Sequence, residues 1–146
     1  MSRIDEAIKV EVPRHVAYER WARFESFPLF MEGVEEVEKV GDSAYRWDAE
    51  IGGVRRTWTA DVTQEIPPER IAWTTMSGET VHQGAVHFTD LGEDRCEVRV
   101  QMQVNPQGFL ENVGDALGFI RRRVQNDLER FKQMCEDPAS VSGGNR

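Results

Sequence analysis

The segment Arg95–Glu136, RCEVRVQMQVNPQGFLENVGDALGFIRRRVQNDLERFKQMCE, joins the clearest strand pattern of the chain to its clearest helix pattern. Apolar and polar residues alternate over Cys96–Val104, which is typical of a strand with one buried face. Asn105-Pro106 then supplies a capping side chain and a residue with a preset φ, and so predicts a helix start. From Phe109 onward apolar residues recur every three or four positions. This spacing predicts an amphipathic helix of about 38 Å, long enough to cross a whole domain.

The rest of the chain predicts more strands and two short helices. Residues 14–24 have helical periodicity, and the apolar run Phe27–Met31 predicts a second short helix or turn packed on the sheet. Gly52-Gly53 suits a tight hairpin turn, because adjacent glycines both accept positive φ. Further strand patterns cover residues 4–12, 45–51, 54–62, 71–75 and 86–88. Short turns imply an antiparallel meander, since parallel strands need long crossovers. The expected class is α+β, with a curved antiparallel sheet around the long C-terminal helix.

Length and composition bound the organisation of the chain. The 146 residues predict one domain over residues 1–136 and a disordered tail over 137–146, where periodicity ends. A net charge of −8 makes nucleic acid a poor partner. No apolar run is long enough for a transmembrane segment, and the charged N-terminus has no signal-peptide core, so a cytoplasmic location is expected. Cys96 and Cys135 are expected to be buried, reduced thiols.

Three tryptophans lie on successive predicted strands with the same inward parity: Trp47, Trp58 and Trp73. A sheet bent around a single helix leaves a space between the two, which becomes a cavity unless large side chains fill it. The three indoles have two interpretations. They either fill the core or line a pocket with flat apolar walls, each with one N–H for polarity.

Polar groups share the inward parity of these tryptophans: Tyr45, Arg56, Thr75 and His82. A buried guanidinium is costly unless it is paired, so Arg56 either extends to water at the hairpin end or meets a ligand. His82 follows a turn and is either a hydrogen-bonded rim histidine or a cavity residue. All four are candidate ligand-binding residues, together with the tryptophans.

Two features of the predicted C-terminal helix have competing interpretations. Gly114 and Gly118 are four residues apart and form a strip without side chains. This strip either lies near the mouth of the pocket or permits close packing on the sheet. The run Arg121–Arg123 is either a solvated face with local partners such as Asp127, or a site that attracts an anionic head group.

Motifs of common enzyme classes are missing from the sequence. It contains no G-x-S-x-G, no phosphate-binding loop and no G-x-G-x-x-G. The histidines His15, His82 and His87 lack metal-ligand spacing, so no metal site and no cofactor are expected. No catalytic residue can be assigned from spacing alone.

The run from Ile4 to Glu136 resembles the START-like helix-grip superfamily (SRPBCC), in particular its polyketide cyclase/dehydrase and coenzyme-Q-binding-like branch. The segments that carry the resemblance are Val10–Pro13, Ala17–Trp21, Phe24–Val34, Gly52–Trp58, Pro67–Trp73, Gly114–Gly118 and Asp127–Lys132. The resemblance implies a β-α-α-β₆-α order, a seven-stranded sheet and a hydrophobic ligand cavity. It maps no catalytic residue onto this chain; Arg56 matches in chemical type only.

Three functions follow from the resemblance and the inward residues. The first is binding of a small hydrophobic molecule such as a quinone, polyketide or lipid fragment. The second is a polyketide cyclase/dehydrase, in which Arg56 would stabilise enolate charge and Tyr45 or His82 would move protons. The third is an interaction domain with a closed cavity. The sequence is also compatible with a homodimer.

Overall fold

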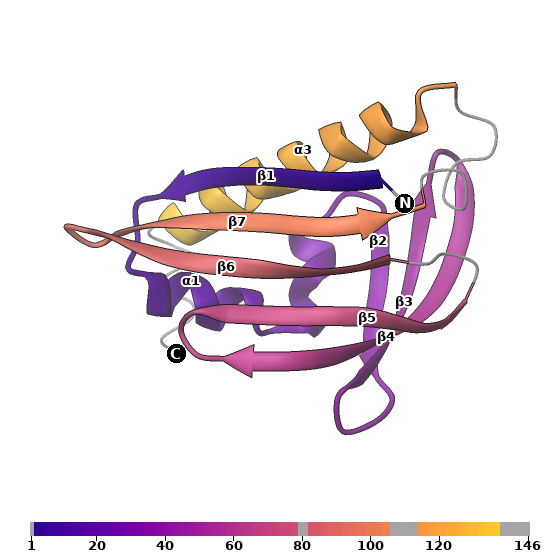
Figure 1. The fold of residues 1–146 in the computed structure, drawn as a ribbon, viewed down its shortest axis with the longest axis horizontal. Helices are drawn as coiled ribbons and strands as arrows, with labels where there is room; N and C mark the ends of the chain where they lie inside the picture. Colours follow the sequence, from indigo (N-terminus) through magenta and orange to yellow (C-terminus); the bar gives the residue numbers. More distant parts are fainter. Residues whose placement is uncertain (1, 79–81, 106–113, 138–146) are drawn as a thin grey trace.

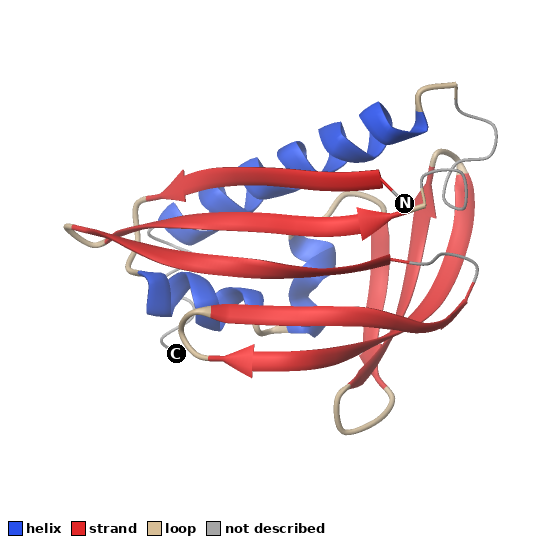
Figure 2. Ribbon diagram, viewed as in Figure 1, coloured by secondary structure: helices blue, strands red, loops and turns tan. Residues whose placement is uncertain are grey.

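The computed structural model describes residues 2–78, 82–105 and 114–137 and has an α+β fold (Figures 1 and 2). Seven strands form one antiparallel sheet in the order β1-β7-β6-β5-β4-β3-β2. The strands are β1 (Ser2–Val10), β2 (Val34–Lys39), β3 (Ala44–Ile51), β4 (Val54–Ile66), β5 (Arg70–Gly78), β6 (His82–Gly92) and β7 (Arg95–Val104). The helical segments are α1 (Arg14–Trp21), the 3-10 helix η1 (Phe24–Leu29) and α3 (Ala116–Glu136). The expected curved sheet, long C-terminal helix and two short helices after the first strand are all confirmed.

Tight turns set the register of the meander. Gly52 and Gly53 have φ of 60° and 82° and join β3 to β4, so that Trp47 lies opposite Trp58 and Ile51 opposite Val54. Both glycines take the positive φ that this two-residue hairpin loop requires. Figure 1 shows the sheet curving strongly between its two ends, with α1, η1 and α3 all on its concave side.

The core is strongest where the helices meet the sheet. The Phe131 ring of α3 lies 4.9 Å from Trp21 of α1 and 5.2 Å from Phe30, which follows η1. Cys96 and Cys135 are both buried in the same core as free thiols. Burial raises the pKa of Cys96 to about 11 and that of Cys135 to about 12, so both thiols stay protonated at neutral pH.

Two expectations about local structure differ from the structure. The long helix begins at Ala116, after a turn at residues 114–115, and Asp115 caps it by accepting a 3.0 Å hydrogen bond from the backbone N–H of Gly118. Its 21 residues span about 31 Å rather than the expected 38 Å. The start expected at Asn105-Pro106 falls largely on residues 106–113, outside the described part of the chain. The tail expected over 137–146 lies outside it too, apart from Asp137.

Strand β2 was not among the predicted segments. Its sequence VEEVEK has valines three residues apart, and its pairing with β3 shifts register between Val34 and Glu36. Such a shift breaks the period-two pattern that marks a strand, so the alternation was absent from the sequence. Its presence completes the seven-stranded sheet that the family resemblance implies.

Replacement of Phe131 by alanine tests the junction between α3 and the short helices. The Phe131 side chain is fully buried, so Phe131→Ala is expected to lower the free energy of unfolding by about 3–5 kcal/mol. Leu29→Ala is the control, because Leu29 is 77% exposed and its loss should change stability by about 0.5 kcal/mol or less. Denaturant unfolding measures both; similar values for the two variants would contradict this account of the core.

Candidate binding cavity

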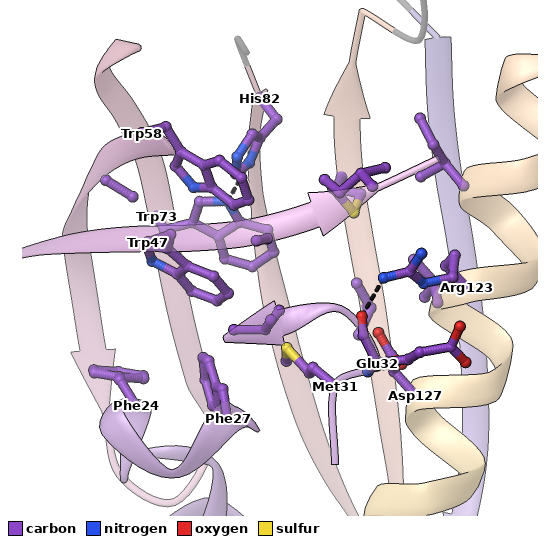
Figure 3. Close-up of a pocket in the computed structure, with 18 of the residues that line it drawn as sticks. Phe24, Phe27, Met31, Glu32, Trp47, Trp58, Trp73, His82, Arg123 and Asp127 are labelled. Atoms are coloured by element: carbon purple, nitrogen blue, oxygen red, sulfur yellow. Dashed lines mark hydrogen bonds between the residues drawn. The ribbon is translucent and has the colours of Figure 1, made fainter. Parts of the chain in front are cut away.

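A cavity of about 200 Å³ lies between the concave face of the sheet and α3 (Figure 3). Its walls come from α1, η1 and the loop after it, from strands β2 to β7 and from residues 119–128 of α3, and they are mostly apolar. The aromatic core around Phe131 fills the space at the other end of α3. The concave side of the sheet is therefore solid at one end and hollow at the other.

Tryptophans form the wall of the cavity opposite α3. The indoles of Trp47 and Trp58 are cross-strand partners, stacked with centroids 5.6 Å apart and planes 16° apart. Trp73 of β5 lies beside them in Figure 3. The neighbouring inward positions hold Ala49 and Ala60, which also line the cavity. Large flat side chains therefore alternate with very small ones, which gives walls without filling the space between them.

His82 is the buried polar group of this wall, and it is 6% exposed. Nε1–H of Trp73 donates a 2.9 Å hydrogen bond to Nδ1 of His82, drawn as a dashed line in Figure 3. Because Nδ1 accepts, the imidazole is the neutral tautomer with its proton on Nε2. Burial lowers the pKa of His82 to about 4, so the ring is uncharged at neutral pH. The wall thus holds a polar ring without a charge.

A charged cluster lies at the opposite side of the cavity, on α3 and the loop after η1. Asp127 Oδ1 accepts hydrogen bonds from the backbone N–H of Glu32 at 3.1 Å and from Nη1 of Arg130 at 3.2 Å. Arg130 also donates to Glu32 Oε1 at 2.7 Å, and Arg123 Nη2 donates to the Glu32 carbonyl. Burial raises the pKa of Asp127 to about 6, against the lowering effect of these donors. Arg123, Asp127 and Glu32 all line the cavity.

Five of the nine predicted site residues have cavity-lining side chains: Tyr45, Trp47, Trp58, Trp73 and His82. Thr75 is not a lining residue; its Oγ1 accepts a 3.2 Å hydrogen bond from the backbone N–H of His82. It positions His82 and is not part of the cavity wall. Of the two interpretations of the tryptophans, lining a cavity is the one that the geometry favours.

Three predicted site residues lie away from the cavity. Arg56 opposes Ala49 on the inward face but sits near the Gly52-Gly53 turn, beyond the cavity lining. Gly114 is exposed in the turn before α3, and Gly118 accommodates the Asp115 cap: a Cβ there would collide with the Asp115 carboxylate. The glycine strip therefore serves the start of the helix and does not form the mouth of the pocket.

Arg123 and Asp127 correct the interpretation of Arg121–Arg123 as a solvated face. Arg121 and Arg122 are exposed, but Arg123 turns inward to the cavity together with Asp127, one turn later. Both residues adjoin the apolar stripe of Ile120, Val124 and Leu128. Two polar residues four apart beside an apolar stripe are the signal in the sequence that could have identified them. Among the described residues, no group of three metal-binding side chains comes together.

The lowered pKa of His82 gives a pH dependence of stability. The pKa is about 4 in the folded chain, against the ordinary histidine value of 6.5 that applies once the chain unfolds. Between these values only the unfolded chain takes up a proton, so the folded state is stabilised above pH 6.5 and loses stability as pH falls. Through this residue the wild type should lose about 3 kcal/mol of its free energy of unfolding between pH 6.5 and 4. We expect His82→Gln to lack that loss. Denaturant unfolding at both pH values measures it.

Asp127 titrates in the same window with the opposite sign, because its raised pKa favours the folded state at low pH and that stability is lost as pH rises. Its contribution is common to the wild type and to His82→Gln, so it cancels in their difference. If the free energies of unfolding of the wild type and His82→Gln differ by the same amount at pH 6.5 and at pH 4, His82 is not a buried neutral ring.

The comparisons with known proteins agree with this fold. The chain is 44% identical over 144 residues to an uncharacterized 17.2 kDa protein from the melC2-rnhH intergenic region of Streptomyces lincolnensis, covering 99% of this chain and 96% of that protein. The solved structures that share the fold include two at 16% identity. One is the Zhui aromatase/cyclase of Streptomyces sp. R1128, with a TM-score of 0.77 over 97% of this chain and 98% of that one. The other is a START superfamily protein of Mycobacterium smegmatis, with a TM-score of 0.66 over 97% and 95%.

The family model described as "Polyketide cyclase / dehydrase and lipid transport" matches residues 10–132, which is most of the chain. The match covers every element from the end of β1 to most of α3, so it includes both walls of the cavity. Among the described residues no helix is both long and apolar enough to cross a membrane. The helix-grip resemblance is confirmed, and the chain belongs to the polyketide cyclase/dehydrase and lipid transport family.

Proposed function

We propose that the protein binds a small, flat hydrophobic molecule in the cavity between α3 and the tryptophan wall. The observation that carries this proposal is the hollow itself: three indoles turn inward and yet leave about 200 Å³ unfilled. An unfilled apolar cavity costs stability, because its lining loses contacts that a packed core would make. A ligand restores those contacts, so the cost supports a binding role.

Size and shape limit the ligand. An apolar cavity of about 150 Å³ is enough for a benzene molecule, so 200 Å³ suits a core of one or two fused rings. The stacked pair of Trp47 and Trp58 offers a flat surface for such a ring, and Phe27 closes the same wall 5.2 Å from Trp47. Stacked and edge-to-face ring contacts are each worth about 0.5–1.5 kcal/mol beyond burial. The geometry therefore supports an aromatic or quinone-like core better than a long, flexible acyl chain.

Filling the cavity tests this proposal with little risk to folding. Ala60 is buried, lines the cavity and lies beside the tryptophans, so Ala60→Leu should occupy part of the space. We expect 2-isopropylnaphthalene to bind the wild type, and the variant to bind it at least about tenfold more weakly. Isothermal titration calorimetry measures the affinity, and denaturant unfolding shows that the variant is folded.

Ala7→Leu is the matched control, because Ala7 is exposed on β1 and the same substitution there adds no bulk to the cavity. The control should bind as the wild type does. Absence of binding to the wild type, or equal binding by all three proteins, would reject the cavity as the ligand site. Native mass spectrometry of protein purified from its host then identifies the mass of the natural ligand.

A second candidate function is catalysis as a polyketide cyclase/dehydrase. The specific observation in its favour is Asp127, a cavity-lining carboxyl group whose pKa is raised to about 6 by burial. An acid or base is most effective when its pKa lies near the working pH. The expected proton carriers fit less well. The pKa of His82 at about 4 makes it a weak base, and the pKa of Tyr45 is raised by burial and by nearby carboxylates.

Asp127→Asn separates the two functions. If the protein is an enzyme, the variant should form aromatic product from a linear poly-β-ketone thioester about 10²–10⁴-fold more slowly, while still binding 2-isopropylnaphthalene. Glu129→Gln is the control, since Glu129 is exposed on the same helix. Product formation is followed by chromatography with ultraviolet detection. No turnover by the wild type would leave ligand binding as the function.

A further inference from the structure

Arg123 lies where the apolar cavity meets a second, polar pocket on the outside. The outer pocket has a volume of about 390 Å³ and is bounded by Gly33, the Gly52-Gly53 turn and Phe119. Arg123, Phe119 and Glu32 line both spaces. In Figure 3 the Arg123 side chain reaches from α3 toward Glu32, across the cavity from the tryptophans. This arrangement makes the Arg123 end of the cavity the end nearest the outside.

The Arg123 side chain is held in place from three directions. Its Nη2 donates to the Glu32 carbonyl, and its guanidinium carbon lies 5.8 Å from the centre of the Phe119 ring. Gly33, with a φ of +82°, leaves the space that the guanidinium occupies, since a Cβ there would lie 2.5 Å from Nη2. A side chain fixed this way loses little further freedom when it binds a ligand.

Arg123 has donors that the described residues leave unused. Among those residues its guanidinium donates one hydrogen bond, from Nη2 to the Glu32 carbonyl. Its Nε is closed off from both pockets, so a ligand in the cavity would meet the guanidinium at Nη1. Some other arginines are paired with carboxylates, such as Arg55 with Glu35 at 2.9 Å and Arg99 with Asp5 at 2.7 Å. A donor that a bound ligand covers costs about 1–3 kcal/mol unless the ligand supplies an acceptor for it.

The charges around Arg123 favour a neutral acceptor over an anion. Arg123 and Arg130 balance the nearby Asp127 and Glu32, and Arg130 is hydrogen-bonded to both of these carboxylates. An anionic group would add an unbalanced negative charge beside Asp127. Glu50 lines the outer pocket and would repel an anion as well. A carbonyl oxygen accepts a hydrogen bond from the guanidinium without adding charge.

We infer that Arg123 determines ligand specificity by donating to a neutral carbonyl oxygen at the outer end of the ligand, while the rings of the ligand lie against the tryptophans. This inference rests on the proposed binding function. It adds that the ligand has a polar end and says which way the ligand lies in the cavity. The ligand enters rings first, and its carbonyl end stays next to the outer pocket. Arg123 is then the group that distinguishes an aryl ketone from a hydrocarbon of the same shape.

The test compares three ligands of similar size: 2-acetylnaphthalene, 2-isopropylnaphthalene and 2-naphthoate. Isothermal titration calorimetry on the full chain should show the ketone binding about tenfold or more tightly than the hydrocarbon, and more tightly than the carboxylate. Arg123→Met keeps a long apolar stem but removes the donors. It should lower the affinity for the ketone about tenfold more than the affinity for 2-isopropylnaphthalene, and so abolish the preference.

Arg122→Met is the matched control: the same charge is lost from the preceding residue of α3, whose side chain is exposed. It should keep the ketone preference. If Arg123→Met does not fold, Arg123→Lys decides instead, since it retains the charge and lacks the planar guanidinium, and it should weaken the preference.

The outcomes separate this inference from the proposed function. Equal affinity of the wild type for the ketone and the hydrocarbon, or tighter binding of the carboxylate, would overturn the role of Arg123 and leave the cavity as a binding site. Equal loss of ketone and hydrocarbon binding in Arg123→Met would show a purely structural role. Failure of all three ligands to bind the wild type would overturn the proposed function and this inference with it.

Discussion

The contact between Phe131 of α3 and the aromatic rings of Trp21 and Phe30 determines how far the rest of α3 stands from the sheet. These large rings fill one end of the concave face and hold the helix there. Toward its N-terminus the helix faces Ala49 and Ala60, which are too small to reach it, and the flat indoles of Trp47 and Trp58. The cavity therefore follows from an uneven distribution of side-chain volume along one helix and needs no special backbone geometry.

The cavity has a gradient of polarity across its width. The tryptophan wall carries a neutral His82 bound to Trp73, and the α3 side carries Arg123 and Asp127. Membership of the polyketide cyclase/dehydrase and lipid transport family is compatible with both holding a ligand and changing it. The two roles share the apolar wall and differ in what the charged side does. A guanidinium that orients a carbonyl serves either role, whereas a carboxyl group with a pKa near 6 contributes only if protons move.

Most of the fold was predictable because its strands keep strict alternation and its turn glycines have required conformations. The inward direction of Trp47, Trp58 and Trp73 followed from that alternation alone. Strand β2 was missed because its register shift removes the period-two signal. The inward turn of Arg123 depends on Gly33 and Glu32, about ninety residues earlier in the chain. The spacing of Arg123 and Asp127 beside the apolar stripe of the helix is a local signal for these two residues, but the contacts that hold Arg123 inward appear only in the tertiary structure.

The stacked indoles of Trp47 and Trp58 have an optical consequence. With centroids 5.6 Å apart and planes inclined by 16°, their electronic transitions couple, so the pair absorbs light as one chromophore and not as two. Coupling of this kind depends steeply on separation and angle, and it appears in circular dichroism as paired bands of opposite sign. Both rings belong to the cavity wall. The paired bands therefore report on the shape of the cavity, and they respond to movements too small to alter the secondary structure.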